Sequence, residues 1–286
     1  MLNRYEQIIQ QGKLPNLKII KIDNILLHED INKQSVEKLR TRIGLSGILQ
    51  NPIVCTRIRN YKKFLLLDGA HRYTALKELE CRYVPAQIVD YHDPLLKLKK
   101  WGHLFNINDE QLIIDTAKNI KNVQCEISKY KKSVTFHKIT PRFYAQIILK
   151  SGRSILITGK NYLKEKIDAI NTLSSLYIES GLIDRISYDD FDSLITYYQD
   201  FTGLIIYPQF TKDEITQIAR KTPKLPAGIT RHIIPKRVLH LNMPLNILRF
   251  ADNQSEVEKF LMDFINQRIK NKAIRFYSES TFFFDD

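Results

Sequence analysis

The sequence is poor in cysteine and tryptophan, and it lacks any long apolar run. Its 286 residues include three cysteines and one tryptophan. Cys55, Cys81 and Cys125 lie far apart and form neither a zinc-binding pattern nor an obvious disulfide set, which fits a reducing compartment. No apolar stretch approaches a membrane span, and residues 1–6 lack the apolar core of a signal peptide. These absences predict a cytoplasmic protein without a membrane anchor.

Two common nucleotide-binding patterns are also missing. The chain has no Walker A glycine-lysine motif and no dinucleotide glycine fingerprint, which argues against the usual P-loop and Rossmann sites. His103, His137 and His240 show no metal-ligand spacing, so we interpret them as surface or core residues. Any nucleotide site in this chain must therefore be built in another way.

Length and composition are those of an ordinary globular protein with an excess of positive charge. Hydrophobic residues make up 43% and charged residues 26%, and the length predicts two domains. The net charge of +13 fits attraction to nucleic acid or phosphorylated ligands, but it also fits a lysine-rich solvated surface. The lysines are scattered from Lys13 to Lys272, which favours the second interpretation.

Strands and helices alternate through about residue 92. Strands are expected over 17–27, 52–55, 64–67 and 83–89. A helix capped by Ser35 is expected to present Val36, Leu39 and Ile43 on one face and to end at Gly44 or Gly47. This alternation predicts a small α/β domain over residues 1–95.

The pattern is weaker beyond that domain. Residues 93–150 look mostly helical, with a mixed stretch near 134–149, and residues 153–221 alternate short strands with helices. Thr211 and Glu214 form a capping box that predicts a helix start. We therefore expect a mixed α/β second domain over 96–250.

A last segment is expected to form a separate element. Ser255 and Glu258 suggest a second capping box at the start of an amphipathic helix. Residues 251–286 are thus predicted to be a C-terminal helix and tail. Its apolar face could pack on the body of the protein or on a second copy, and the sequence leaves both open.

The most specific motif covers residues 65–79. An apolar run ends in Asp68-Gly69, His71-Arg72 follow, and Ala75, Leu76 and Leu79 then recur at helical spacing. A strand, a glycine turn and a helix start together bring unpaired backbone N–H groups and the positive end of the helix dipole to one point. The arrangement predicts a phosphate site, in which Asp68 is a candidate Mg²⁺ ligand.

This motif resembles the nucleotide-binding box of the ParB/sulfiredoxin superfamily, and residues 44–54 resemble its other hallmark. The resemblance covers roughly residues 17–92 and implies a ParB/sulfiredoxin-like N-terminal domain. Sulfiredoxins carry a catalytic cysteine where this chain has Ala70, which argues against sulfinic-acid reduction. The partitioning branch has an arginine-rich box and a helix-turn-helix. Here His71 replaces one arginine, and no clear helix-turn-helix follows.

Three further motifs narrow the resemblance. His28-Glu29 follow the first strand, Trp101 comes shortly after the first domain, and Pro226-Ala227-Gly228-Ile229-Thr230-Arg231-His232 lies far downstream. Taken alone, Glu29 could simply cap a turn, and residues 230–232 could be an exposed edge strand. In this order, together with the 68–72 box, the motifs resemble the free L-serine kinases, which make O-phospho-L-serine.

The resemblance implies a role for each motif. Glu29 would be the catalytic base, and the box Asp68, Gly69, Ala70, His71 and Arg72 would bind the nucleotide, with Asp68 also catalytic and holding Mg²⁺. Serine would be recognised by Trp101, Thr230, Arg231 and His232. The implied ligands are ATP or ADP, Mg²⁺ and L-serine. The product would supply siderophore, cysteine or related amino-acid biosynthesis.

Other functions stay open at this stage. A ParB-like, nucleotide-dependent DNA-binding transcriptional regulator would use the same box and the positive charge. A non-catalytic nucleotide-sensing partner is a third reading. The sequence does not choose between ATP and ADP, and it leaves a homodimer open.

Overall fold

The computed structural model describes residues 14–130, 141–179, 181–187, 191–221 and 223–275. The chain divides into two compact units. Unit 1 comprises Met1–Ile25, Lys33–Leu95 and Ile234–Asp286, and unit 2 comprises Leu26–Asn32 and Leu96–Ile233. Both units are discontinuous, whereas the domain division expected from the sequence, at residues 95 and 250, is sequential. That division stays a prediction.

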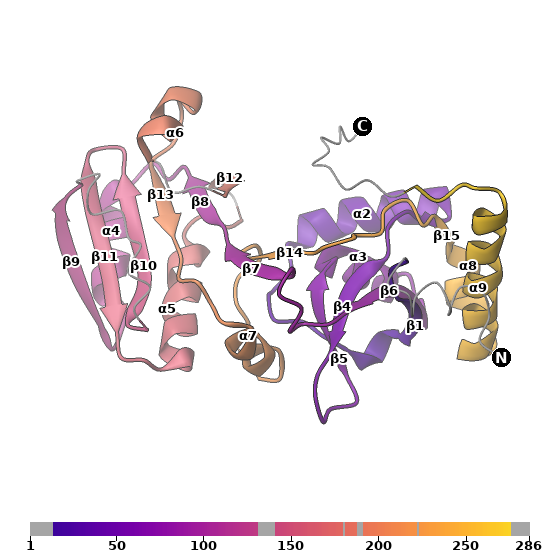
Figure 1. The fold of residues 1–286 in the computed structure, drawn as a ribbon. Coiled ribbons are helices and arrows are strands. Elements are labelled where there is room, and N and C mark those ends of the chain that lie inside the picture. The colour runs from indigo at the N-terminus through magenta and orange to yellow at the C-terminus, as the bar shows by residue number, and fades with distance from the viewer. Residues whose placement is uncertain (1–13, 131–140, 180, 188–190, 222, 276–286) are drawn as a thin grey trace. The chain divides into compact units, whose positions relative to one another are not determined.

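Unit 1 is built on a five-stranded mixed sheet (Figure 1) in the order β1-β6-β4-β5-β2. β4 runs parallel to β6, while the pairs β1–β6 and β4–β5 are antiparallel. The strands are β1 (Leu17–Lys21), β2 (Ile25–Leu26), β4 (Ile53–Arg57), β5 (Phe64–Asp68) and β6 (Tyr83–Val89). The other elements are η1 (Ile22–Asn24), α2 (Lys33–Ser46), β3 (Ile48–Leu49), α3 (Ala70–Glu78), β15 (Met243–Pro244), α8 (Leu245–Phe250) and α9 (Gln254–Lys270). The α/β alternation expected through residue 92 is therefore confirmed.

Unit 2 is built on a six-stranded sheet in the order β12-β8-β13-β10-β11-β9, with every pair antiparallel. Its strands are β8 (Gly102–Phe105), β9 (Val123–Lys129), β10 (Phe143–Leu149), β11 (Arg153–Gly159), β12 (Leu182–Ile186) and β13 (Gly203–Ile206). Its helices are α4 (Glu110–Asn119), α5 (Leu163–Ser175), α6 (Phe191–Tyr197) and α7 (Lys212–Ala219). A separate two-stranded ribbon pairs β7 (Lys97–Lys100) with β14 (Thr230–Ile233).

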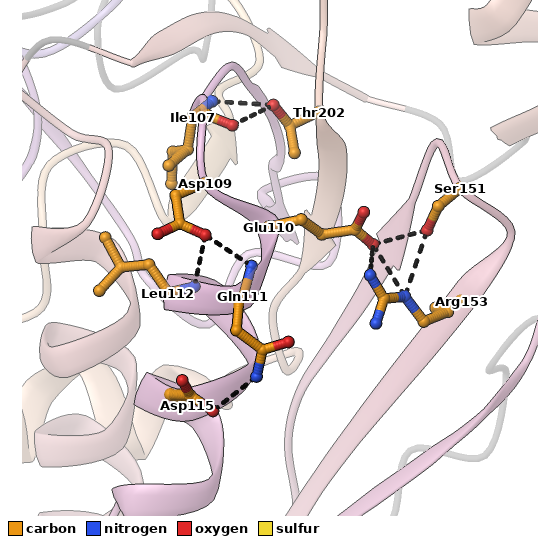
Figure 2. Close-up of polar contacts among 9 residues, drawn as sticks. All are labelled: Ile107, Asp109, Glu110, Gln111, Leu112, Asp115, Ser151, Arg153 and Thr202. Carbon is orange, nitrogen blue, oxygen red and sulfur yellow. Dashed lines mark hydrogen bonds and ion pairs between the residues drawn. The ribbon is translucent and has the colours of Figure 1, made fainter.

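Local polar contacts fix α4 on this sheet, as Figure 2 shows. The Asp109 side chain accepts hydrogen bonds from the backbone N–H groups of Gln111 and Leu112 and so caps the helix. Glu110 accepts from Ser151 at 2.5 Å and pairs with Arg153 of β11 at 3.0 Å. The first turn of α4 is therefore joined to the start of β11.

The structure corrects three expectations about these elements. The helix expected to be capped by Ser35 begins at Lys33, so Ser35 lies within α2 rather than at its N-cap position. The described part of 93–133 is not mostly helical, because β7, β8 and β9 lie there beside the helix α4, while β10 lies in the stretch that was expected to be mixed. The last helix begins at Gln254 rather than Ser255. Asn253 caps it by accepting from the backbone N–H of Glu256, so the expected capping box is absent there.

The apolar face of α9 packs within unit 1. Val257, Leu261 and Ile265 are buried, the helix contacts β1, and the Gln254 amide donates to the carbonyl of Ile19 at 3.2 Å. The face left open by the sequence is thus covered by the body of the protein. Among the described helices, α9 included, none combines the length and apolarity that a bilayer span requires.

Candidate active site

The turn between β5 and α3 has the backbone that its sequence predicts. Gly69 adopts φ +96°, a conformation that favours glycine, and a Cβ at this position would lie 2.8 Å from the Arg72 guanidinium. Ala70 and His71 form the first turn of α3 and are half-buried. The N-terminus of a nine-residue helix therefore opens directly after Asp68, as an anion site would require.

Asp68 holds two arginines at this turn. Its Oδ2 accepts from Arg72 at 2.6 Å, four residues along the chain, and also from Arg237. The Arg72 guanidinium makes a further 3.4 Å contact with the carbonyl of Pro52. Two guanidinium groups are thus concentrated beside the start of α3. Arg237 was missed by sequence reasoning, because no motif links it to a residue 169 positions earlier.

The described residues do not fit a metal centre held by the protein alone. They contain no group of three or more His, Cys, Asp or Glu side chains suited to a metal ion. One oxygen of Asp68, Oδ2, already accepts from two cationic side chains, Arg72 and Arg237. Mg²⁺ is usually bound by one or two carboxylates together with substrate phosphates, so it would arrive with a nucleotide as part of that substrate. The role of Asp68 as a Mg²⁺ ligand stays a prediction.

Glu29 is held by three donors within unit 2. Its Oε1 accepts from the Thr230 backbone N–H at 2.6 Å and from the Thr230 hydroxyl at 2.7 Å. Its Oε2 accepts from the Gly228 N–H at 2.9 Å. The backbone on either side of Glu29 pairs with Leu225, through Leu225 N–H to the His28 carbonyl at 3.0 Å and Asp30 N–H to the Leu225 carbonyl at 2.7 Å.

These contacts fix the protons around Glu29. An ionised carboxylate only accepts hydrogen bonds, so the Thr230 hydroxyl proton points at Glu29. The Thr230 oxygen must then accept from His28 Nε2, which lies 2.9 Å away. An ionised carboxylate has about four acceptor positions. Three are used here, and Oε2 carries only one of the three bonds, so it can accept one more donor.

The β7–β14 ribbon carries or adjoins the other residues predicted to recognise serine, namely Trp101, Arg231 and His232. Strand pairing sets Thr230 opposite Lys100 and Arg231 opposite Lys99. The Arg231 guanidinium lies over the Trp101 ring, 4.4 Å from its centroid. His232 and His28 meet edge to face, with ring centroids 5.5 Å apart.

The structure therefore gathers the predicted residues into two clusters. Glu29, Trp101, Thr230, Arg231 and His232 form one cluster in unit 2, and residues 68–72 with Arg237 form another in unit 1. The first offers a carboxylate with spare acceptor capacity, and the strand that holds it through Thr230 also carries the Arg231 guanidinium. The second offers cationic donors at a helix N-terminus.

Comparison with known proteins gives these clusters a context. Residues 4–97 match the family model of the ParB N-terminal domain. Over 233 residues the chain is 29% identical to an ATP-dependent L-serine kinase of Staphylothermus marinus, which covers 81% of this chain and 90% of that protein. It is 25% identical over 265 residues to the ATP-dependent L-serine kinase SbnI of Staphylococcus aureus, covering 91% and 96%. An ADP-dependent L-serine kinase, SerK of Thermococcus kodakarensis, is 23% identical over 224 residues, covering 76% and 86%.

Solved structures confirm the fold. A C-terminally truncated SbnI from Staphylococcus aureus matches with a TM-score of 0.69 and 22% identity over 88% of this chain and 97% of that one. A glutamate-to-glutamine variant of a free serine kinase in complex with AMP matches with a TM-score of 0.67 and 18% identity over 82% and 95%. The α/β fold with a ParB-like N-terminal domain, and the resemblance to the free serine kinases, are therefore confirmed.

Proposed function

We propose that this chain, whose resemblance to small-molecule kinases extends over most of its length, transfers a phosphoryl group from ATP or ADP to free L-serine. The product is O-phospho-L-serine. The observation that carries the proposal is the Glu29 carboxylate with one spare acceptor position, held by Gly228 and by Thr230, the residue that precedes Arg231 in β14. The named activities of the relatives support the same reaction.

Glu29 acts as the general base in this proposal. The serine hydroxyl donates to Oε2, the oxygen that carries a single hydrogen bond, and its proton moves to Glu29 as the oxygen attacks the terminal phosphorus. The bond from that phosphorus to the leaving phosphate oxygen breaks, and the shortened nucleotide departs. Because the three backbone and hydroxyl donors already orient the carboxylate, little reorganisation is needed at the moment of transfer.

Arg231 binds the serine carboxylate. Its planar guanidinium suits a two-pronged contact with a carboxylate, and stacking on Trp101 keeps that plane fixed. Thr230 and His232 complete the serine-recognising ribbon, where Thr230 also links Glu29 to His28. A substrate with both an α-carboxylate and a β-hydroxyl is therefore favoured over a simple alcohol.

The nucleotide phosphates bind at the 68–72 box. The first backbone N–H groups of α3, His71 and Arg72 supply donors, and Asp68 orients Arg72 and Arg237 towards the same ligand. Complexes of a solved relative with AMP support nucleotide binding in this fold. No step of the mechanism is assigned to a metal held by the protein.

The DNA-binding alternative is not favoured, because the relatives that match most of the chain are named as kinases. We propose that the enzyme works in the cytoplasm and that its product enters cysteine, siderophore or related amino-acid biosynthesis. The genes next to the coding sequence test that last assignment. A homodimer stays a prediction.

A product assay tests the proposal. The protein is incubated with Mg²⁺, L-serine and either ATP or ADP, and O-phosphoserine is followed by ³¹P NMR and mass spectrometry. We expect product with L-serine but not with D-serine, because Arg231 would hold the carboxylate, Glu29 the hydroxyl and His232 the amino group, and three contacts fix the handedness of the substrate. Glu29→Gln should lower kcat by about 10²–10⁴-fold, the usual contribution of a general base.

The neighbouring carboxylate provides the matched control. Asp30→Asn changes a side chain one residue away and should retain most of the activity, because no hydrogen bond joins the Asp30 carboxylate to the ribbon of Thr230 and Arg231. Absence of phosphoserine with both nucleotides would contradict the proposed function. Full activity of Glu29→Gln with loss of activity in Asp30→Asn would move the base to Asp30.

A further inference from the structure

The turn at residues 227–229 is held by an unusual run of contacts on one side. Three successive carbonyl oxygens each accept a hydrogen bond, two from residues of β8 and β12 and one from Trp101, which lies between β7 and β8. Ala227 accepts from Arg185 at 3.4 Å, Gly228 from His103 at 2.8 Å, and Ile229 from the backbone N–H of Trp101 at 3.1 Å. Every carbonyl of residues 227–229 therefore accepts a hydrogen bond.

The opposite side of the same turn faces the carboxylate of Glu29. The N–H groups of Gly228 and Thr230 both donate to it, at 2.9 and 2.6 Å. Gly228 contributes to both sides, since its carbonyl is held by His103 while its N–H holds Glu29. A shift of this residue would move the donors of the carboxylate directly.

Strand register explains why two side chains reach the turn together. His103 of β8 lies opposite Arg185 of β12, so both side chains emerge on the same face of the sheet. They contact adjacent carbonyls of the turn, those of Gly228 and Ala227. The rigid sheet of unit 2 is therefore connected to the Glu29 loop through His103 and Arg185.

A buried chain of hydrogen bonds fixes the proton of His103. A carbonyl oxygen only accepts, so Nε2 must carry the hydrogen that is donated to Gly228. Nδ1 is then the acceptor, and it lies 3.0 Å from the Tyr177 hydroxyl, which contacts the Tyr207 hydroxyl in turn. The direction of donation is Tyr207 to Tyr177 to His103 to Gly228. His103 and Tyr207 are completely buried.

Burial also keeps His103 neutral. Removal from water is the largest cause of a lowered pKa, about 4, and the positive charge of Arg185 lowers it further, while the hydrogen bond to Gly228 opposes the change. Tyr177 and Tyr207 face the same imidazole, and burial raises the pKa of each phenol above its ordinary value. At neutral pH this hydrogen-bonded series therefore consists of one neutral imidazole, that of His103, and two neutral phenols, those of Tyr177 and Tyr207.

We propose that His103, backed by Tyr177 and Tyr207, is a positioning residue for Glu29: it holds the Gly228 peptide so that the backbone donors of the turn aim at the carboxylate. This inference rests on the proposed function, because it assigns His103 to the same site. From the sequence, His103 was interpreted only as a surface or core residue. In this proposal it has a defined role, which is to position the Gly228 peptide.

Kinetics of matched variants test the proposal. His103→Phe keeps the ring shape but removes the donor to Gly228, and we expect kcat to fall by about 10²-fold, the effect of a misplacement of about 1 Å at a reacting group. The KM for the nucleotide should stay unchanged. His103→Gln can still donate from its amide at the position of Nε2 and should recover most of the lost activity.

The two tyrosines provide a graded series. Tyr177→Phe removes the donor to Nδ1 and should lower kcat less than His103→Phe, and Tyr207→Phe should lower it least. Tyr144→Phe is the control, because Tyr144 is also buried in unit 2 and donates to a backbone carbonyl, that of Lys160, at 2.5 Å, away from the turn. It should leave kcat unchanged.

A spectroscopic readout separates this inference from the kinase assignment. Imidazole ¹⁵N shifts should show His103 as the neutral Nε2–H form between pH 8 and pH 5, and His103→Phe should shift the Gly228 amide proton and speed its exchange. A titration near pH 6.5, an Nδ1–H form, or an unchanged Gly228 amide would overturn the inference. So would a folded His103→Phe variant with wild-type kcat. If the wild type makes no phosphoserine, the proposed function fails, while the NMR result still decides the role of His103.

Discussion

Gly228 is the residue on which the unit 2 cluster around Glu29 depends most directly. It adopts φ +80°, and a Cβ placed on it would lie 2.0 Å from Arg185 Nε. Its N–H donates to Glu29 and its carbonyl accepts from His103. Backbone conformation, packing and chemistry therefore all require glycine at this one position.

Gly228→Ala should damage activity and stability together. The left-handed conformation alone costs a residue with a Cβ about 1–2 kcal/mol, and the contact with Arg185 must also be relieved by moving the turn. We expect kcat for serine phosphorylation to fall by at least about tenfold, because the Gly228 N–H leaves Glu29. Enzyme kinetics and denaturant unfolding measure the two effects.

Gly152→Ala is the matched control for this change. Gly152 has φ +84° in the turn between β10 and β11 of the same unit, but a Cβ there would meet nothing within 4 Å. It should show the conformational cost in stability and no loss of kcat. Equal loss of activity in both variants would mean that the geometry of the Gly228 turn is not what orients Glu29.

At this scale the sequence predicted some residues and missed others for a physical reason. Glu29 and Thr230 stand in recognisable motifs, and the structure brings them within 2.7 Å of each other through the Thr230 hydroxyl. Their roles stay predictions. Arg237 and His103 were missed because their partners, Asp68 and Gly228, are more than a hundred positions away in the chain. Only the folded chain shows such contacts.

At the scale of the elements, the sequence predicted the start of α7 correctly. The Thr211 hydroxyl accepts from the Glu214 N–H at 3.1 Å, and the Glu214 carboxylate accepts from the Thr211 N–H at 2.8 Å. Both partners lie within one helical turn, so nothing beyond four consecutive residues is needed to form the capping box.

Thr211→Ala should therefore destabilise α7 without affecting the site. We expect a loss of about 1 kcal/mol in the free energy of unfolding, measured by denaturant titration, and unchanged kcat. Thr216→Ala is the control, since the Thr216 hydroxyl bonds only to the Lys212 carbonyl one turn earlier and alanine favours a helix. If Thr216→Ala lost as much stability as Thr211→Ala, the capping box would not be the source of the effect.

The failure over residues 93–133 has an equally physical cause. All four residues of β8 are buried, so this strand shows no alternation of buried and exposed side chains. A strand covered on both faces reads as a continuous apolar run, which periodicity cannot distinguish from a buried helix. Helix caps could be predicted because they depend on a few consecutive residues. Strands that are defined by burial in a six-stranded sheet could not be predicted in this way.

For the molecule as a whole, the proposed function assigns the nucleotide to one unit and serine to the other. The nucleotide box and Arg237 belong to unit 1, while Glu29 and the Thr230–His232 strand belong to unit 2. The net charge of +13 needs no nucleic acid to explain it, because the scattered lysines favour a solvated surface.

Hydrogen exchange measured with each ligand alone should show which unit each ligand binds. AMP should slow amide exchange at residues 68–74 and around Arg237, and L-serine should slow it at residues 28–30 and 227–232. At a ligand concentration about 100 times Kd, local openings that require the ligand to leave should become about 100-fold rarer. D-serine at the same concentration is the control and should protect neither region. Protection of residues 68–74 by L-serine alone, or of residues 227–232 by AMP alone, would contradict the assignment of the nucleotide to unit 1 and of serine to unit 2.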